Sequence, residues 1–267
     1  MKTTTANIYT FSLTSKIVLT ATSLFAIAGF TWPFFAPDKD AAHFAQYFFW
    51  IALPLSFILL IAQLSDRSLD AKSIALLGML AALLAALRPL GAGAIGLEPM
   101  WFLLILAARV FGSSFGFLLG VLGMLASAFF TGGIGPWLTY QLFAAGVIGL
   151  FAGSLGKNLR GKPELILLIA ISILSALGYG LLMDLQFWPW ALGSNTQLSF
   201  IPGGDFQINL RRFLTFHFLS SMAWDIPRAV LTSLLIISTG PAVLSALRRT
   251  QRKAAFLTPI EFSERLN

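Results

Sequence analysis

The sequence predicts an all-α, polytopic integral membrane protein with about eight transmembrane helices. Of its 267 residues, 57% are hydrophobic and 11% are charged, and the mean hydropathy is +0.81. A soluble domain carries about 25% charged residues, so this composition excludes an ordinary globular protein. The apolar residues also form long runs separated by short polar segments, which is the pattern of helices that cross a bilayer.

The first predicted span, Ile17–Phe35, ends before the polar segment Asp38–Asp40. It is longer than the apolar core of a typical signal peptide, so we expect a retained helix. The second, Phe44–Leu64, ends before a charged segment that begins at Asp66. The third, Ser73–Leu87, is closed by Arg88-Pro89, because proline does not continue a helix.

The fourth and fifth spans, Met100–Phe111 and Phe115–Phe130, are short for a bilayer that needs about 20 residues. The sixth, Trp137–Leu155, follows a glycine-rich turn. The seventh is Leu165–Leu185, and the eighth, Phe213–Thr239, follows the long connection from residue 186 to residue 212. A connection of that length on a scaffold is often functional, and we expect it to close over a pocket.

Charge placement predicts that both termini are cytoplasmic. With that orientation, thirteen of the eighteen lysines and arginines lie on the cytoplasmic side, as the positive-inside rule requires. The other five are Lys39, Arg88, Arg211, Arg212 and Arg228. The basic residues lie between apolar spans rather than on one soluble face, so no nucleic-acid partner is expected.

The sequence contains no motif that indicates an enzyme, a cofactor or a metal site. A phosphate loop is absent: Gly156-Lys157 lacks both the upstream glycine and the following Ser or Thr, so this chain is not expected to hydrolyse ATP. The segment Gly112–Gly116 has the letters of a GxSxG nucleophile elbow. It joins two apolar helices rather than a strand and a helix, so we interpret it as a glycine turn.

A strip of small residues follows one side of the third span. Gly78, Ala82 and Ala86 recur every four residues, with Ala81 and Ala85 beside them. Small residues at this spacing allow helices in lipid to approach closely. The partner is either a helix of another subunit or a helix of this chain, and the motif alone favours internal packing.

Asp225 and Arg228 lie one turn apart near the middle of the predicted last span. A charge at mid-membrane costs about 2.5–3.5 kcal/mol on insertion scales, so neither is expected to face lipid. The spacing lets them pair with each other on one helix face. Three roles remain open for this pair: lining a substrate cavity, relaying a proton, or holding helices together.

Polar and aromatic groups also converge at the predicted outer side, the usual composition of a small-molecule pocket. Tryptophans at a membrane interface are ordinary anchors, which accounts for part of this pattern. The predicted binding residues, including the charged pair, are Arg88, Glu98, Trp137, Gln141, Asp184, Trp188, Asn195, Asn209, Trp224, Asp225 and Arg228.

The order of these motifs resembles bacterial S components, the membrane-embedded substrate-binding subunits of energy-coupling factor (ECF) type ABC vitamin importers. The resemblance covers residues 70–247, about six spans, and within the family the chain is most similar to members linked with cobalamin or its precursors. The segments that carry it, after the small-residue helix, are Leu97–Pro99, Ala108–Gly112, Phe115–Gly120, Thr131–Trp137, Gly180–Asp184, Phe187–Trp190 and Trp224–Arg228.

The resemblance implies a six-helix S-component-like bundle that captures a vitamin or related micronutrient outside a bacterial cell. It further implies docking, through the small-residue helix, onto a transmembrane coupling (T) subunit driven by two ATPase subunits. Residues 1–69 depart from the family because they carry a cytoplasmic tail and two extra helices. Residues 70–247 form the substrate-binding core, and residues 248–267 a basic cytoplasmic tail.

Two other functions remain open from the sequence. The first alternative is a stand-alone secondary transporter that uses Asp225 and Arg228 for proton coupling. The second is a membrane scaffold that transports nothing. Inverted repeats favour the first alternative, and the hydropathy pattern contains no convincing pair of them.

Overall fold

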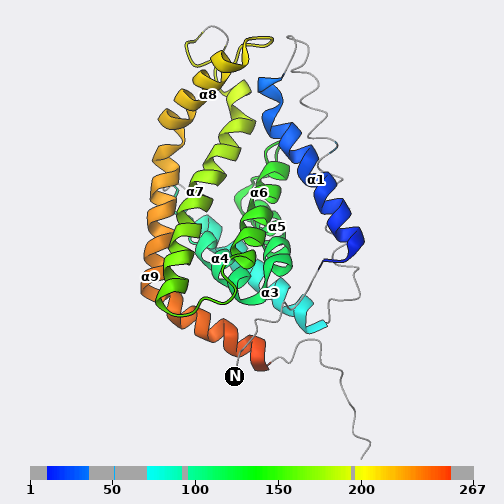
Figure 1. Ribbon diagram of the computed structural model, residues 1–267, viewed down its shortest axis with the longest axis vertical. Coiled ribbons are helices and arrows are strands. Elements are labelled where there is room, and N and C mark those ends of the chain that lie inside the picture. The colour runs from blue at the N-terminus through cyan, green and yellow to red at the C-terminus, as the bar shows by residue number, and fades with distance from the viewer. Residues whose placement is uncertain (1–10, 36–50, 52–70, 92–95, 194–195, 254–267) are drawn as a thin grey trace, which may run out of the picture.

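The computed structural model describes residues 11–35, 51, 71–91, 96–193 and 196–253. Throughout these ranges the regular secondary structure is helical, and they contain no strand (Figure 1). The elements are α1 (Leu13–Thr31), η1 (Trp32–Phe34), α3 (Ala71–Leu87), η2 (Arg88–Gly91), α4 (Met100–Phe111), α5 (Ser113–Thr131), α6 (Leu138–Ser154), α7 (Lys162–Ala191), α8 (Phe206–Ser220) and α9 (Met222–Lys253).

Five helical segments in the described part of the chain are long and apolar enough to cross a membrane. They are α1 with η1, α3 with η2, α5, α7 and α9, while α4 and α6 are apolar but shorter. The chain is therefore a helical membrane protein. The predicted second span, Phe44–Leu64, lies outside the described residues, so eight spans remain a prediction.

The end of the chain differs from the prediction of one helix from Phe213 to Thr239. α8 ends at Ser220 and α9 begins at Met222, so Ser221 divides the expected helix in two. Pro227 lies in the second turn of α9 and has no N–H to donate, which weakens helical pairing near this division. Asp225 and Arg228 consequently occupy the first two turns of α9 rather than the middle of a span.

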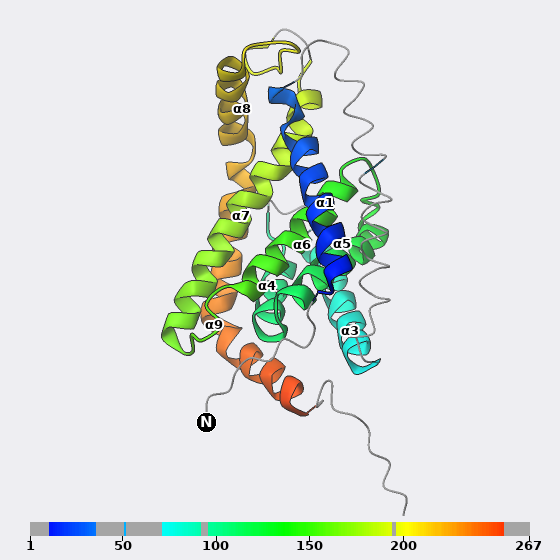
Figure 2. The same ribbon diagram turned by 45° about the vertical axis from the view of Figure 1, so that its right-hand side comes forward.

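The helices form a central group, α3 to α6, flanked by the longer helices (Figure 1). α7 and α9 run side by side along one flank in both views, and α8 continues that flank beyond the central group (Figures 1 and 2). α1 lies on the other side and packs against α7. The flank and the central group thus meet along α4, which contacts both α7 and α9, and along α6, which contacts α7.

The close packing of α5 on α6 depends on small residues. A Cβ at Gly116 would overlap the carbonyl of Gly149, and a Cβ at Gly120 would overlap the carbonyl of Ala145. Both pairs are spaced by four residues on their helices, so the two backbones touch along one seam. The glycines of the Phe115–Gly120 segment therefore serve packing inside the bundle.

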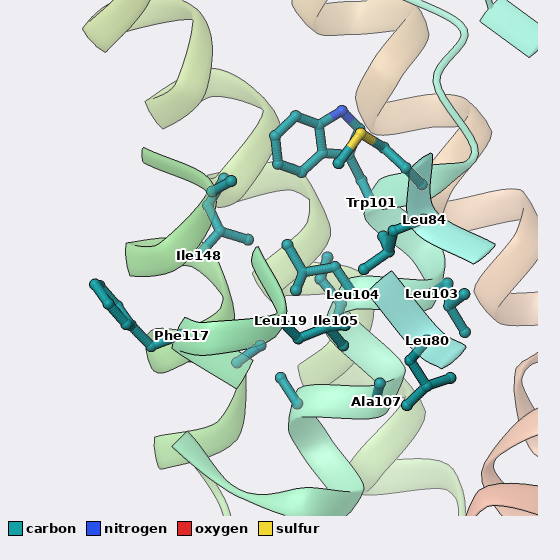
Figure 3. Close-up of a cluster of buried hydrophobic side chains, with 14 of the residues drawn as sticks. Leu80, Leu84, Trp101, Leu103, Leu104, Ile105, Ala107, Phe117, Leu119 and Ile148 are labelled. Atoms are coloured by element: carbon teal, nitrogen blue, oxygen red, sulfur yellow. The ribbon is translucent and has the colours of Figure 1, made fainter. Parts of the chain in front are cut away.

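The main hydrophobic core fills the space between α3, α4, α5 and α6. Figure 3 shows Leu84, Leu104 and Leu119 converging there, together with Trp101 from the first turn of α4. A second cluster joins α1, α6, α7 and α8 around the buried Trp188. A cavity with charged and aromatic walls lies between α6, α7, α8 and α9, and residues of both clusters, such as Tyr179 and Phe216, form part of its lining.

Candidate functional site

A cavity of about 490 Å³ lies between the helices α6 to α9. Arg88 of η2 and Glu98, just before α4, complete its wall. This volume is within the usual range for pockets that hold small molecules, roughly 300–1,000 Å³. Eight of the eleven predicted binding residues line it. The described lining residues are Arg88, Glu98, Trp137, Gln141, Tyr179, Gly180, Met183, Asp184, Gln186, Phe187, Phe216, Ser220, Ser221, Trp224, Asp225 and Arg228.

A glycine before α4 lets the segment that carries Glu98 approach the start of α9. Gly96 has a φ of +66°, a region that favours glycine, and a Cβ there would overlap the backbone carbonyl of Trp224. This close approach places Glu98 beside Arg228, 130 residues away in the sequence. The segment before α4 and the first turns of α9 are thereby joined by an ion pair.

Four charged side chains form a continuous network on the cavity wall. Arg228 Nη1 donates to Asp225 Oδ1 at 2.6 Å, and Ser221 Oγ donates to Asp225 Oδ2 at the same distance. Arg228 Nε lies 3.4 Å from Glu98 Oε2, and Arg88 Nε lies 3.8 Å from Glu98 Oε1. The predicted pairing of Asp225 with Arg228 is present, and Glu98 extends it to a second arginine.

Arg88 at one end of this network and Glu98 in its middle are also bonded to neutral groups. Arg88 donates to Ser127 Oγ at 2.9 Å and to Gln141 Oε1 at 3.3 Å. Trp101 Nε1 donates to Glu98 Oε2 at 2.8 Å. Since the carboxylates and guanidiniums are hydrogen-bonded on several sides, the network keeps its charges in place inside an apolar bundle.

Asp184 forms a separate polar group on the same cavity. His217 Nδ1 lies 2.9 Å from Asp184 Oδ2, and Ser220 Oγ donates to the same oxygen at 3.0 Å. Phe213 stacks on the His217 ring, with centroids 5.9 Å apart. These contacts tie the end of α8 to α7 and fix the orientation of the Asp184 carboxylate.

Two predicted binding residues in the described part of the chain, Trp188 and Asn209, do not line the cavity. Trp188 is fully buried, and its Nε1 donates to the carbonyl of Leu198 at 2.7 Å, so it anchors the connection after α7. Asn209 bonds both the N–H and the carbonyl of Ile201, which shapes the turn before α8. Asn195 lies outside the described residues.

The described part of the connection between α7 and α8 does not cover the pocket in the way that its length predicts. Gln186 and Phe187 do line the cavity, but they belong to α7, which extends to Ala191. None of the described residues from 192 to 205 is part of the lining. Instead, Arg212 donates to the carbonyls of Thr196 and Ser199, which holds this connection against α8.

The structure divides the predicted docking strip of α3 into two faces. Ala81 and Ala85 are buried in the main core, where they pack internally. Gly78, Ala82 and Ala86 are exposed, and no described atom lies within 4 Å of a Cβ built at Gly78. The exposed three therefore form a shallow surface, while the other two act as core residues.

Several cavity residues on α7 are absent from the residues that the sequence predicts. Tyr179, Met183 and Phe187 follow one another at four-residue spacing, beside Asp184 on the same helix. Tyr179 is the most informative of them, because the Arg228 guanidinium lies 4.9 Å from its ring centroid. Their helical spacing around Asp184 is the signal in the sequence that points to this face.

A second buried ionic cluster lies at the other end of α4. Arg109 Nε donates to Glu164 Oε1 at 2.7 Å, and both side chains are almost fully buried. The remaining Arg109 nitrogens donate to the carbonyls of Leu155, Gly156 and Leu159 after α6. Arg248 of α9 reaches the same carboxylate oxygen, so this cluster fastens α4, α6, α7 and α9 together.

Comparison with known protein families, curated proteins and solved structures finds no match to this chain.

Proposed function

We propose that this chain is the membrane-embedded substrate-binding subunit of an ECF-type ABC importer, and that its cavity binds a vitamin or related micronutrient. The observation that carries the proposal is the cavity of about 490 Å³ between the helices. Its wall combines aromatic faces with a few oriented polar groups, which is the usual composition of a ligand pocket. The motif resemblance to S components supplies the class of importer.

The surface of α3 supports the same proposal. Gly78, Ala82 and Ala86 are exposed and leave a shallow face on which a helix of another subunit fits closely. None of these three residues lines the cavity. Binding and docking are therefore assigned to separate surfaces, as a protein that must hold a ligand while it engages a coupling subunit requires.

Affinity purification from the native bacterial membrane tests this function directly. The expected result is co-purification of a T subunit and two ATPase subunits, together with a small molecule that mass spectrometry identifies. Ala82→Leu should lose the partners and keep the small molecule. Recovery of the chain without any ATPase, and without a bound molecule, would contradict the proposal and favour the scaffold.

A stand-alone secondary transporter is the second candidate function. The buried network of Asp225, Arg228 and Glu98 favours it, because ionisable groups inside a membrane protein often mark proton pathways. Purified chain in proteoliposomes distinguishes the two candidates. Uptake driven by a proton gradient without any ATPase would support the transporter, whereas ligand binding without uptake supports the binding subunit.

A further inference from the structure

The charged side chains of the cavity are unevenly paired. The described lining contains two arginines, Arg88 and Arg228, and three carboxylates, Glu98, Asp184 and Asp225. Both arginines lie beside Glu98, and Arg228 also binds Asp225. Asp184 is left with His217 and Ser220 as its described partners, and neither carries a permanent positive charge.

One oxygen of Asp184 is available to a ligand. His217 and Ser220 both bond Oδ2, and no described residue donates to Oδ1. The Asp184 side chain is only 14% exposed. Because a mostly buried carboxylate is unfavourable unless its oxygens are bonded or its charge is balanced, Oδ1 attracts a donor or a cation that enters the cavity.

The aromatic residues of the cavity favour the same kind of ligand. Trp137, Phe187 and Trp224 all line it and remain 43%, 56% and 50% exposed, so their rings are accessible. A cation placed over an aromatic face is attracted by the negative charge density of the ring. An anion, by contrast, would find both arginines already engaged by carboxylates.

We propose that the cavity selects a compact, planar nitrogen heterocycle that carries one positive charge. The charged group lies against Asp184 Oδ1, and the ring stacks on Trp137 or Trp224. A volume of about 490 Å³ suits a molecule of one or two rings. This proposal rests on the binding function proposed above and narrows its ligand class.

The test compares heterocycles of three charge classes on the full-length protein in detergent, by thermal shift and titration calorimetry. The cationic probes are thiamine and 1-methylnicotinamide. The neutral probes are nicotinamide, riboflavin and cobalamin, and the anionic probes are nicotinate and biotin. 1-Methylnicotinamide, nicotinamide and nicotinate share one ring and differ mainly in charge, so they isolate the effect that Asp184 is expected to produce.

Asp184→Asn removes the charge and keeps the shape of the side chain. We expect it to weaken the binding of the cationic probes roughly 10- to 100-fold, because it removes the negative charge that pairs with their quaternary nitrogen. Asp205→Asn is the matched control, because Asp205 caps α8 outside the cavity and asparagine is an equally good cap. It should leave the affinity unchanged.

The outcomes separate this inference from the proposed function. Tightest binding by a neutral or anionic probe shows that the chain binds ligands but overturns the positive-charge requirement. Cationic binding that is unchanged in Asp184→Asn overturns the role of Asp184. Absence of binding by every probe and of any co-purifying small molecule removes the binding function itself, and this inference with it. If Asp184→Asn does not fold, the charge series on the unaltered protein decides.

Discussion

The carboxylate of Asp225 in α9 lies directly against Gly180 of α7 and fills the space that a Cβ at position 180 would occupy. The two residues are 45 positions apart, and their contact is what allows the ionic network to reach the cavity wall beside α7. Gly178, one half-turn earlier on the same helix, has no described atom within 4 Å of the position that a Cβ would take. The two glycines therefore have different roles.

We expect Gly180→Ala to destabilise the protein by about 1–3 kcal/mol, because the added methyl displaces the Asp225 carboxylate from its partners. Gly178→Ala should be neutral or stabilising by up to about 1 kcal/mol, since alanine is the better helix former. Melting temperatures of the two variants in detergent give the comparison. Equal effects at both positions would show that the contact with Asp225 carries no energetic weight.

Asp225 and Arg228 should behave as a coupled pair. Arg228→Gln leaves the fully buried Asp225 carboxylate without its cation, which costs about 3–5 kcal/mol, whereas Asp225→Asn leaves Arg228 paired with Glu98 and should cost less. Asp225→Asn combined with Arg228→Gln should be more stable than the sum of the single effects predicts. A double-mutant cycle on unfolding or ligand affinity measures this coupling, and simple additivity would mean that the 2.6 Å contact contributes nothing specific.

Leucine substitutions on the two faces of α3 should have different effects: loss of uptake on the exposed face and loss of stability on the buried face. Ala82→Leu on the exposed face is expected to abolish uptake in cells that contain all subunits, while the purified variant still binds ligand. Ala85→Leu is the control. The Ala85 side chain is fully buried in the core, so a leucine there overpacks the core and should lower the stability by about 1–3 kcal/mol. Loss of ligand binding by Ala82→Leu would instead indicate internal packing at that position.

Arg109 should not tolerate lysine. Its guanidinium serves Glu164 and three backbone carbonyls at once, and one ammonium group cannot reach all four acceptors. We expect Arg109→Lys to cost about 1–3 kcal/mol for the acceptors left unpaired. Arg249→Lys is the control, because Arg249 is exposed on α9 and a surface change is usually within about 0.5 kcal/mol. Thermal unfolding of both variants decides, and a similar small loss in each would contradict the assigned role.

Topology can be tested with single cysteines, because the chain contains none. Thr131 and Ser154 are exposed and lie at the last residues of α5 and α6, so they occupy opposite ends of the α5–α6 hairpin. The charge bias predicts that an impermeant thiol reagent labels Thr131→Cys on intact cells and labels Ser154→Cys only after permeabilisation. The reverse pattern would falsify the orientation.

Much of the helical framework follows from the sequence. The predicted span Met100–Phe111 has the same bounds as α4, because an apolar run between Pro99 and Gly112 has clear physical limits. The chemical composition of the cavity is also predictable in outline. Arg88, Glu98, Asp184, Asp225 and Arg228 are costly in an apolar chain unless they have partners, and this cost alone marks them as candidates.

What only the tertiary structure decided is which of those candidates share a space. Trp188 and Trp224 look equivalent in sequence, but the first is buried against Leu198 and the second lines the cavity. Ala81 and Ala82 are neighbours, but one faces the core and the other faces outward. Composition and spacing determine that a residue must be satisfied or packed, because those requirements act locally along the chain. The partner that satisfies it comes from a distant segment, as Glu98 and Arg228 show at a separation of 130 residues, so only the arrangement of the segments in space determines it.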